Sequence, residues 1–124
     1  MTWLLDSVIL IDHFNGMAAA TSYLRRVLGQ SCISVITRAE VLAGFDEAGR
    51  YLALALLDRC PTLEIDRAIA DLAAGLRRRH RWRLPDAFQA ALAQKHGLKL
   101  VTRNTRDFPP GRFDFVLVPY RGGA

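Results

Sequence analysis

Three acidic residues in this chain each stand where an apolar segment meets the predicted start of a helix. They are Asp6, Glu40 and Asp86. If the apolar segments are parallel strands of one sheet, their carboxyl ends share an edge and the three side chains converge there. Converging carboxylates repel one another, and a hard divalent cation such as Mg²⁺ or Mn²⁺ relieves that repulsion. Such a cation can lower the pKa of a bound water and stabilise charge on phosphate oxygens, as phosphodiester hydrolysis requires.

Each of the three acids also has a purely structural interpretation. Asp6 could cap a helix, and Glu40 could complete a capping box with Thr37. Asp86 could interact with the dipole of the first helical turn. A fourth acid, Asp12, is expected to form a salt bridge with a nearby arginine. Residue types and spacing alone leave these alternatives open.

Alternating strands and helices would bring the three acids together. Short apolar runs predict strands at 3–5, 32–35, 63–65, 98–102 and 115–118, with helices between them. This alternation indicates an α/β fold in three layers, in which helices flank a mostly parallel sheet of about four to five strands. Because no repeat or linker interrupts the chain, residues 1–124 are expected to form a single domain.

The segment from Leu84 to Phe108 joins a helix, a strand and a polar turn. Pro85 is favourable in the first turn of a helix. The strand ends at Thr102, whose hydroxyl could contact a phosphate or support the acids. In the turn that follows, Asn104 could coordinate a cation through its amide oxygen. Asp107 could add a carboxylate or cap the turn.

Positive charge is concentrated in the second half of the chain. The formal net charge is +5, and residues 67–124 hold twelve Lys or Arg against four acids, whereas residues 1–66 hold five against eight. An anionic partner is therefore expected near the segment that carries Asp86. Hydrophobic residues make up 51% and charged residues 23%, which indicates a globular rather than a disordered chain.

Three stretches of the sequence together resemble the PIN-domain ribonucleases, above all the VapC-type toxins of bacterial toxin–antitoxin systems. They are residues 4–7 with Ile11 and Asp12, residues 34–44, and residues 84–108. The three matches occur in the family's order and extend over essentially the whole chain. The resemblance implies a PIN-like fold for the predicted α/β domain.

By this resemblance, Asp6, Glu40 and Asp86 are metal ligands and catalytic residues, and the cofactor is Mg²⁺, with Mn²⁺ as a possible substitute. The family often carries an acid where Asn104 stands, so Asp107 is expected to supply the missing catalytic carboxylate.

An arginine-rich cluster at residues 77–83 also contains Trp82. Positive charge there could simply complement the dipole of a helix end. Guanidinium groups also bind phosphates through paired hydrogen bonds, and an aromatic ring can stack on an unpaired base. The residues expected to contact RNA are Arg78, Arg79, Arg81, Trp82, Thr102 and Asn104. Neutralising an acidic antitoxin segment is a rival use of the same cluster.

The resemblance implies a metal-dependent endoribonuclease toxin that cuts tRNA or ribosomal RNA and so arrests translation. The implied partners are a cognate VapB-type antitoxin and a second copy of the chain, with DNA contacted only through the antitoxin. A catalytically inactive PIN-like module that binds RNA or antitoxin is the alternative. A metal-dependent DNA nuclease is another, and all-deoxy substrates would distinguish it.

The sequence contains no evident targeting or membrane segment. The N-terminal apolar run is interrupted by Asp6 and Asp12 and has no basic flank, so no signal peptide is expected. No apolar run reaches the roughly 18 residues that a membrane-spanning helix requires. Cys32 and Cys60 have no metal-like spacing and are expected to be reduced thiols. These features predict a cytoplasmic protein without membrane contact.

Overall fold

A five-stranded sheet runs through the middle of the molecule in the computed structural model, which describes residues 1–121. The last three residues of the predicted domain, 122–124, lie outside it. The strands are β1 (Trp3–Leu5), β2 (Ser31–Ser34), β3 (Thr62–Leu63), β4 (Lys99–Val101) and β5 (Val116–Leu117). Their order across the sheet is β3-β2-β1-β4-β5, and every neighbouring pair is parallel. The predicted α/β fold with a parallel sheet is therefore confirmed.

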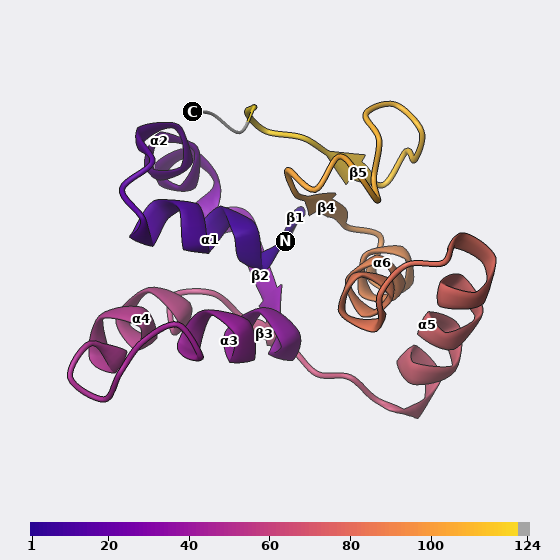
Figure 1. Ribbon diagram of the computed structural model, residues 1–124, viewed down its shortest axis with the longest axis horizontal. Coiled ribbons are helices and arrows are strands. Elements are labelled where there is room, and N and C mark those ends of the chain that lie inside the picture. The colour runs from indigo at the N-terminus through magenta and orange to yellow at the C-terminus, as the bar shows by residue number, and fades with distance from the viewer. Residues whose placement is uncertain (122–124) are drawn as a thin grey trace.

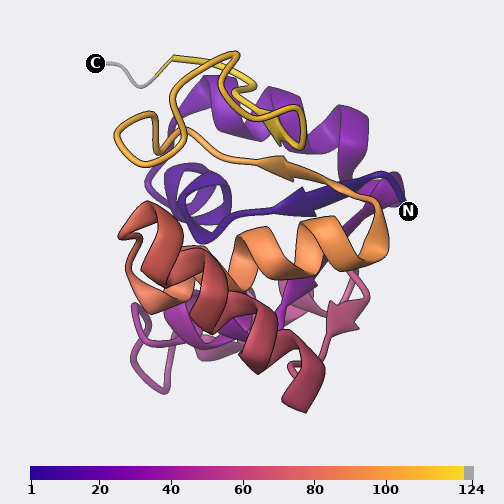
Figure 2. The same ribbon diagram turned by 90° about the vertical axis from the view of Figure 1, so that its right-hand side faces the viewer.

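Helices cover both faces of this sheet and form the outer two of three layers (Figure 1). One face carries α1 (Ser7–Phe14), α2 (Ala18–Val27), α3 (Val35–Leu42) and α4 (Arg50–Leu57), with a short 3₁₀ turn, η1 (Leu28–Gln30), after α2. The other face carries α5 (Arg67–His80) and α6 (Leu84–His96), which lie side by side beneath β1 and β4 in Figure 2.

The alternation of side chains along the strands divides the core in two. Leu4 and Leu100 pack with α5 and α6, whereas Leu5 and Val101 pack with α1 to α4. Successive residues of a strand point to opposite faces, so each central strand contributes to both layers of the core. This arrangement explains why apolar residues follow one another directly in β1 and at the end of β4.

Two residues explain where helix α6 begins and ends. Pro85 lies in its first turn, and Gly97 ends it in the left-handed conformation, with φ 65°. Ala87 and Ala90 are completely buried, because small side chains let the helix lie close to the sheet. Gln94, near the end of the helix, is exposed and borders an open cleft.

The start of α3 differs from the predicted capping box. Ser34 is the N-cap, and its Oγ accepts a hydrogen bond of 3.1 Å from the Thr37 backbone N–H. Thr37 therefore lies inside the first turn, and Glu40 lies one turn further along the helix, free of any capping role. The sequence offered two hydroxyl residues three positions apart, and the end of β2 determined which of them became the cap.

No helix within residues 1–121 is both long and apolar enough to cross a membrane. Cys32 and Cys60 are both buried and unpaired, as the sequence predicted.

Candidate active site

The carboxyl ends of β1 and β4 meet at one edge of the sheet, and Asp6 stands at its centre. Asp6 caps α1, since its Oδ1 accepts a hydrogen bond of 2.8 Å from the Ser7 N–H. Its Oδ2 accepts a hydrogen bond of 2.6 Å from the Thr102 hydroxyl, which follows β4. Asp6 is only 8% exposed. The structural and the functional interpretation of this acid are thus compatible, because one oxygen serves the cap and the other faces the neighbouring strand.

Gln89 is a member of this site that the sequence analysis missed. Its Nε2 donates hydrogen bonds to Asp6 Oδ1 (3.2 Å) and to Thr37 Oγ1 (2.8 Å), so it connects α6 with β1 and α3. The side chain is 1% exposed, and its Oε1 has no partner among residues 1–121. One sequence signal could have revealed it, because Gln89 is a polar residue within an alanine run, one helical turn after Asp86.

Glu40 reaches the same edge from α3. The Ser7 hydroxyl donates a hydrogen bond to Glu40 Oε1, which joins the start of α1 to the middle of α3. Glu40 is exposed, whereas Ser7 and Asp6 are buried. Glu40 therefore lies at the rim of the site, where a solvent-borne ligand can reach its carboxylate.

Asp86, in the first turn of α6, is the acid whose titration is most altered. Burial raises its pKa to about 6, and the negative charges of Asp6 and Asp107 act in the same direction against a smaller effect of Arg83. When Asp86 is protonated it can donate a hydrogen bond to the Asp107 side chain. The structure therefore brings three carboxylates from β1, α6 and the turn after β4 within electrostatic reach of one another.

The turn after β4 holds Asp107 firmly. Asn104 Nδ2 donates a hydrogen bond of 3.0 Å to Asp107 Oδ2, and the Asp107 N–H donates one of 3.3 Å to Asn104 Oδ1. The Asn104 N–H itself donates to the Thr102 hydroxyl at 3.0 Å. Asn104 thus directs the neighbouring carboxylate, and Thr102 connects this turn to Asp6.

The predicted salt bridge of Asp12 is confirmed, and it fastens the same turn to α1. Arg103 donates from Nε to Asp12 Oδ2 at 2.6 Å and from Nη2 to Oδ1 at 2.7 Å. The Tyr120 hydroxyl adds a hydrogen bond of 2.9 Å to Oδ2. The hydrogen bond from Arg103 holds the pKa of Asp12 below its usual value, although burial opposes it. Asp12 is therefore a structural anchor outside the acidic group.

Carboxylate oxygens are suitable ligands for a hard divalent cation. Burial is the main cause of the raised pKa of Asp86, and a cation would offset the additional effect of the Asp6 and Asp107 charges. Among residues 1–121, however, no three His, Cys, Asp or Glu side chains form a group that could hold a metal ion as they stand. Asp6 and Glu40 are hydrogen-bonded to protein groups instead. The chemistry of the donors fits the predicted cofactor, and the ligand set stays a prediction.

The arginine cluster divides in the structure. Arg78, Arg79 and Arg81 are exposed at the end of α5. Trp82 is only 3% exposed, and its ring packs against Phe108 with a centroid distance of 4.8 Å. A ring enclosed in this way has no open face for a base, so the prediction that Trp82 stacks on RNA is wrong. The polar flanking residues masked the fact that this aromatic residue belongs to the core.

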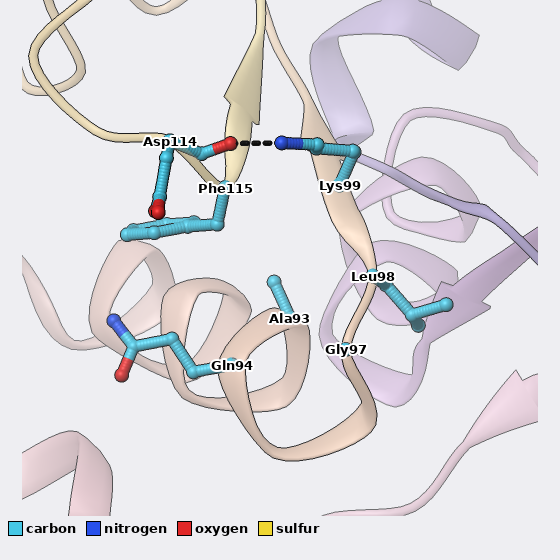
Figure 3. A pocket seen from close by; sticks show the side chains of 7 residues that line it. All are labelled: Ala93, Gln94, Gly97, Leu98, Lys99, Asp114 and Phe115. Atoms are coloured by element: carbon cyan, nitrogen blue, oxygen red, sulfur yellow. Dashed lines mark hydrogen bonds between the residues drawn. The ribbon is translucent and has the colours of Figure 1, made fainter.

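An open cleft at the opposite edge of the sheet has a different character (Figure 3). Its volume is about 430 Å³, and it lies between the end of α6 and the amino ends of β4 and β5. Its polar groups include Lys99, whose Nζ donates to the Asp114 carbonyl oxygen, and Gln94. It contains no pair of acids, so the acidic edge is the stronger candidate for chemistry.

The parallel sheet with helices on both faces defines a three-layer α/β domain, and its acids gather at the carboxyl ends of the strands. The PIN domain model matches residues 3–109, and the chain belongs to that family. The chain is 37% identical over 113 residues to Ribonuclease VapC10 of Mycobacterium tuberculosis, a match that covers 86% of this chain and 85% of the relative.

Solved structures agree with this assignment. A chain of a toxin–antitoxin complex from Klebsiella pneumoniae superposes with a TM-score of 0.87 at 36% identity, covering 97% of this chain and 99% of that one. FitAcB from Neisseria gonorrhoeae has a TM-score of 0.78 at 21% identity, covering 95% and 98%, and it supports the fold alone. The resemblance to VapC-type proteins drawn from the sequence is therefore confirmed.

Proposed function

We propose that this protein is a metal-dependent endoribonuclease and the toxin of a VapBC-type toxin–antitoxin pair. It hydrolyses phosphodiester bonds in tRNA or ribosomal RNA and so arrests translation in the cytoplasm. The observation that carries the proposal is the meeting of Asp6, Asp86 and Asp107 at one sheet edge. The 37% identity to Ribonuclease VapC10 supports the choice of RNA as substrate.

Asp6, Glu40 and Asp86 would hold the cation, Mg²⁺ or Mn²⁺. The bound cation supplies charge stabilisation on the phosphate and activation of water. Thr102 and Gln89 keep the Asp6 carboxylate oriented through their hydrogen bonds, and Ser7 does the same for Glu40. The proposed ligands thus belong to the regular elements of the fold or directly follow them, and neighbouring polar groups orient them.

Asp107 supplies the fourth carboxylate of the site. Asn104, which stands where the family often has an acid, donates to Asp107 Oδ2 and so directs that carboxylate. Asp107 in turn lies close enough to Asp86 to raise its pKa. These contacts favour an active enzyme over the alternative of an inactive binding module, since a module without chemistry has no need to keep Asp6, Asp86 and Asp107 in a repulsive group.

Partners follow from the same family. The relative from Klebsiella pneumoniae was solved as a toxin–antitoxin complex, and we extend that association to this chain. Its partners are a cognate VapB-type antitoxin, the RNA substrate and a second copy of itself. DNA is reached only through the antitoxin, and Arg78, Arg79 and Arg81 contribute RNA contacts.

Induced expression of the chain in bacterial cells tests the proposal, with Asp86→Asn as the matched variant that keeps the shape of the side chain. The wild type is expected to stop incorporation of labelled amino acids before DNA synthesis falls, and to leave tRNA or ribosomal RNA fragments. Cells with the variant should continue to translate. Continued translation while folded wild-type protein accumulates without antitoxin would contradict the proposal.

A further inference from the structure

Four arginines from two distant segments line one cleft beside the acidic edge. Arg79 and Arg81 belong to the end of α5, whereas Arg106 and Arg112 belong to the loop between β4 and β5. The cleft has a volume of about 270 Å³, and Asp107 also lines it. We call it the arginine cleft. Arg79 and Arg81 belong to the arginine-rich cluster of the sequence, whereas only the fold brings Arg106 and Arg112 next to them.

The end of α5 is built so that its last turn meets the loop. Arg81 has φ 61°, the one non-glycine residue with a left-handed backbone among residues 1–121. Its N–H donates a hydrogen bond of 2.7 Å to the Arg77 carbonyl, and the Arg77 guanidinium donates one of 2.7 Å to the Trp82 carbonyl. A left-handed conformation at a β-carbon-bearing residue persists only where its surroundings fix it. Arg77 is thus used to stabilise the turn.

Buried aromatic rings connect the two halves of the cleft. The Trp82 indole donates a hydrogen bond of 3.0 Å to the Asp107 carbonyl, and its ring stacks on His80 at 4.3 Å. Phe113 meets both rings edge-on, and the Arg112 guanidinium lies 5.4 Å from the centre of the Phe113 ring. The aromatic rings therefore fix the backbone segments that carry the arginines, and Arg112 itself packs on Phe113.

Positive charge exceeds negative charge in the cleft, because four arginines and one acid, Asp107, line it. All four arginines are exposed, and none of them forms an ion pair with an Asp or Glu within residues 1–121. Burial lowers the pKa of His80, and the charges of Arg79 and Arg112 lower it further, so both guanidinium groups lie close to one imidazole. Like charges held together in this way create a strong local potential for an anion.

We propose that the arginine cleft binds a backbone phosphate of RNA adjacent to the phosphate that is cleaved. Arginine forks bind phosphate oxygens through paired hydrogen bonds. Asp107 borders both the cleft and the acidic group, so a strand held at the catalytic acids passes directly over the arginines. The inference rests on the proposed ribonuclease function and assigns Arg106 and Arg112, far from the arginine-rich cluster in sequence, to substrate binding.

Binding of a short fluorescent single-stranded RNA, measured by anisotropy with chelator present over a range of KCl concentrations, tests the cleft without cleavage. The variants are Arg106→Ala/Arg112→Ala and, as a charge-matched control, Arg50→Ala/Arg59→Ala, whose side chains are exposed near α4. Thermal unfolding of each variant verifies the fold. The cleft variant should lose affinity by about tenfold, with the slope of log K against log[salt] shallower by about 1. The control should stay close to wild type.

Equal RNA affinity and equal salt slope in the two double variants would contradict the proposal that the arginine cleft binds RNA phosphate. So would a cleft variant that binds RNA as the wild type does but loses affinity for an Asp/Glu-rich peptide, because the cleft would then serve an acidic protein segment. These results are separable from the catalytic proposal. A wild-type chain that binds RNA through these arginines and cleaves none contradicts the nuclease and supports the cleft.

Discussion

Replacing Asp86 by Asn should stabilise the metal-free protein while it abolishes activity. In the fold the Asp86 pKa is raised from 3.8 to about 6 by burial and by the charges of Asp6 and Asp107. At neutral pH the ionised carboxylate therefore costs the folded state up to ~3 kcal/mol, from about 1.4 kcal/mol per pKa unit. The variant also loses the favourable interaction of Asp86 with the α6 dipole, and this loss offsets up to about 1 kcal/mol of the expected stabilisation. Partial exposure reduces the penalty further, so we expect a net gain of ~1–2 kcal/mol.

The sign of the pH dependence follows from linkage. Because the folded state holds the Asp86 proton up to about pH 6 and the unfolded state releases it near 3.8, wild-type stability falls as pH rises between these values. The stabilisation by Asp86→Asn should therefore be complete above pH 6 and shrink towards zero below pH 4.

Urea unfolding followed by circular dichroism, with chelator, at neutral pH and near pH 4 measures this difference. Asp71→Asn, an exposed acid on α5, is the control and should change little at either pH. Added Mg²⁺ should stabilise the wild type more than Asp86→Asn, because the cation binds only the folded acidic site. A variant no more stable than wild type at neutral pH, or a gain in stability that does not depend on pH, would show that the ionised Asp86 does not destabilise the fold.

Three further substitutions test the supporting contacts. Gln89→Leu removes both hydrogen bonds from Nε2 and should lower RNA cleavage by about 10–100-fold in a chain that still folds. Full activity would show that Asp6 needs no such support. Arg103→Ala leaves the 5%-exposed Asp12 without its guanidinium and should cost about 2 kcal/mol in urea unfolding. The loss of stability should be full above pH 3.8 and decline below it, because the Asp12 pKa is lowered in the fold. A loss that stays constant with pH would show that the ionised Asp12 is not its cause. Ser34→Ala should cost about 1 kcal/mol by the same assay, whereas equal stability would exclude Ser34 as the cap of α3.

Local sequence signals predicted the elements well, because they depend on neighbours in the chain. Apolar runs located every strand within about two residues, and Pro85 marked the first turn of α6. The cap of α3 was misassigned because Ser34 and Thr37 are chemically equivalent and the end of β2 decides between them. The sequence alone therefore could not decide which hydroxyl residue caps α3, because the tertiary structure determines it.

Contacts between distant residues were harder to predict. Gln89 and Asp6 are 83 positions apart, and only the packing of α6 against β1 brings them together. Trp82 was misread because its flanking arginines suggested a surface, whereas its ring packs in the core against Phe108. Asp6, in contrast, was predictable, since a strand end that is also a helix start places a carboxylate at the sheet edge whatever its partners are.

Cleavage of total cellular RNA by the purified chain tests the central claim most directly. The assay compares Mg²⁺, Mn²⁺ and chelator, with Asp6→Ala beside the wild type. We expect discrete fragments that require a divalent cation and disappear in the variant, while all-deoxy oligonucleotides stay intact. Folded, antitoxin-free protein that leaves RNA intact with either cation, or fragments that persist in Asp6→Ala, would contradict it.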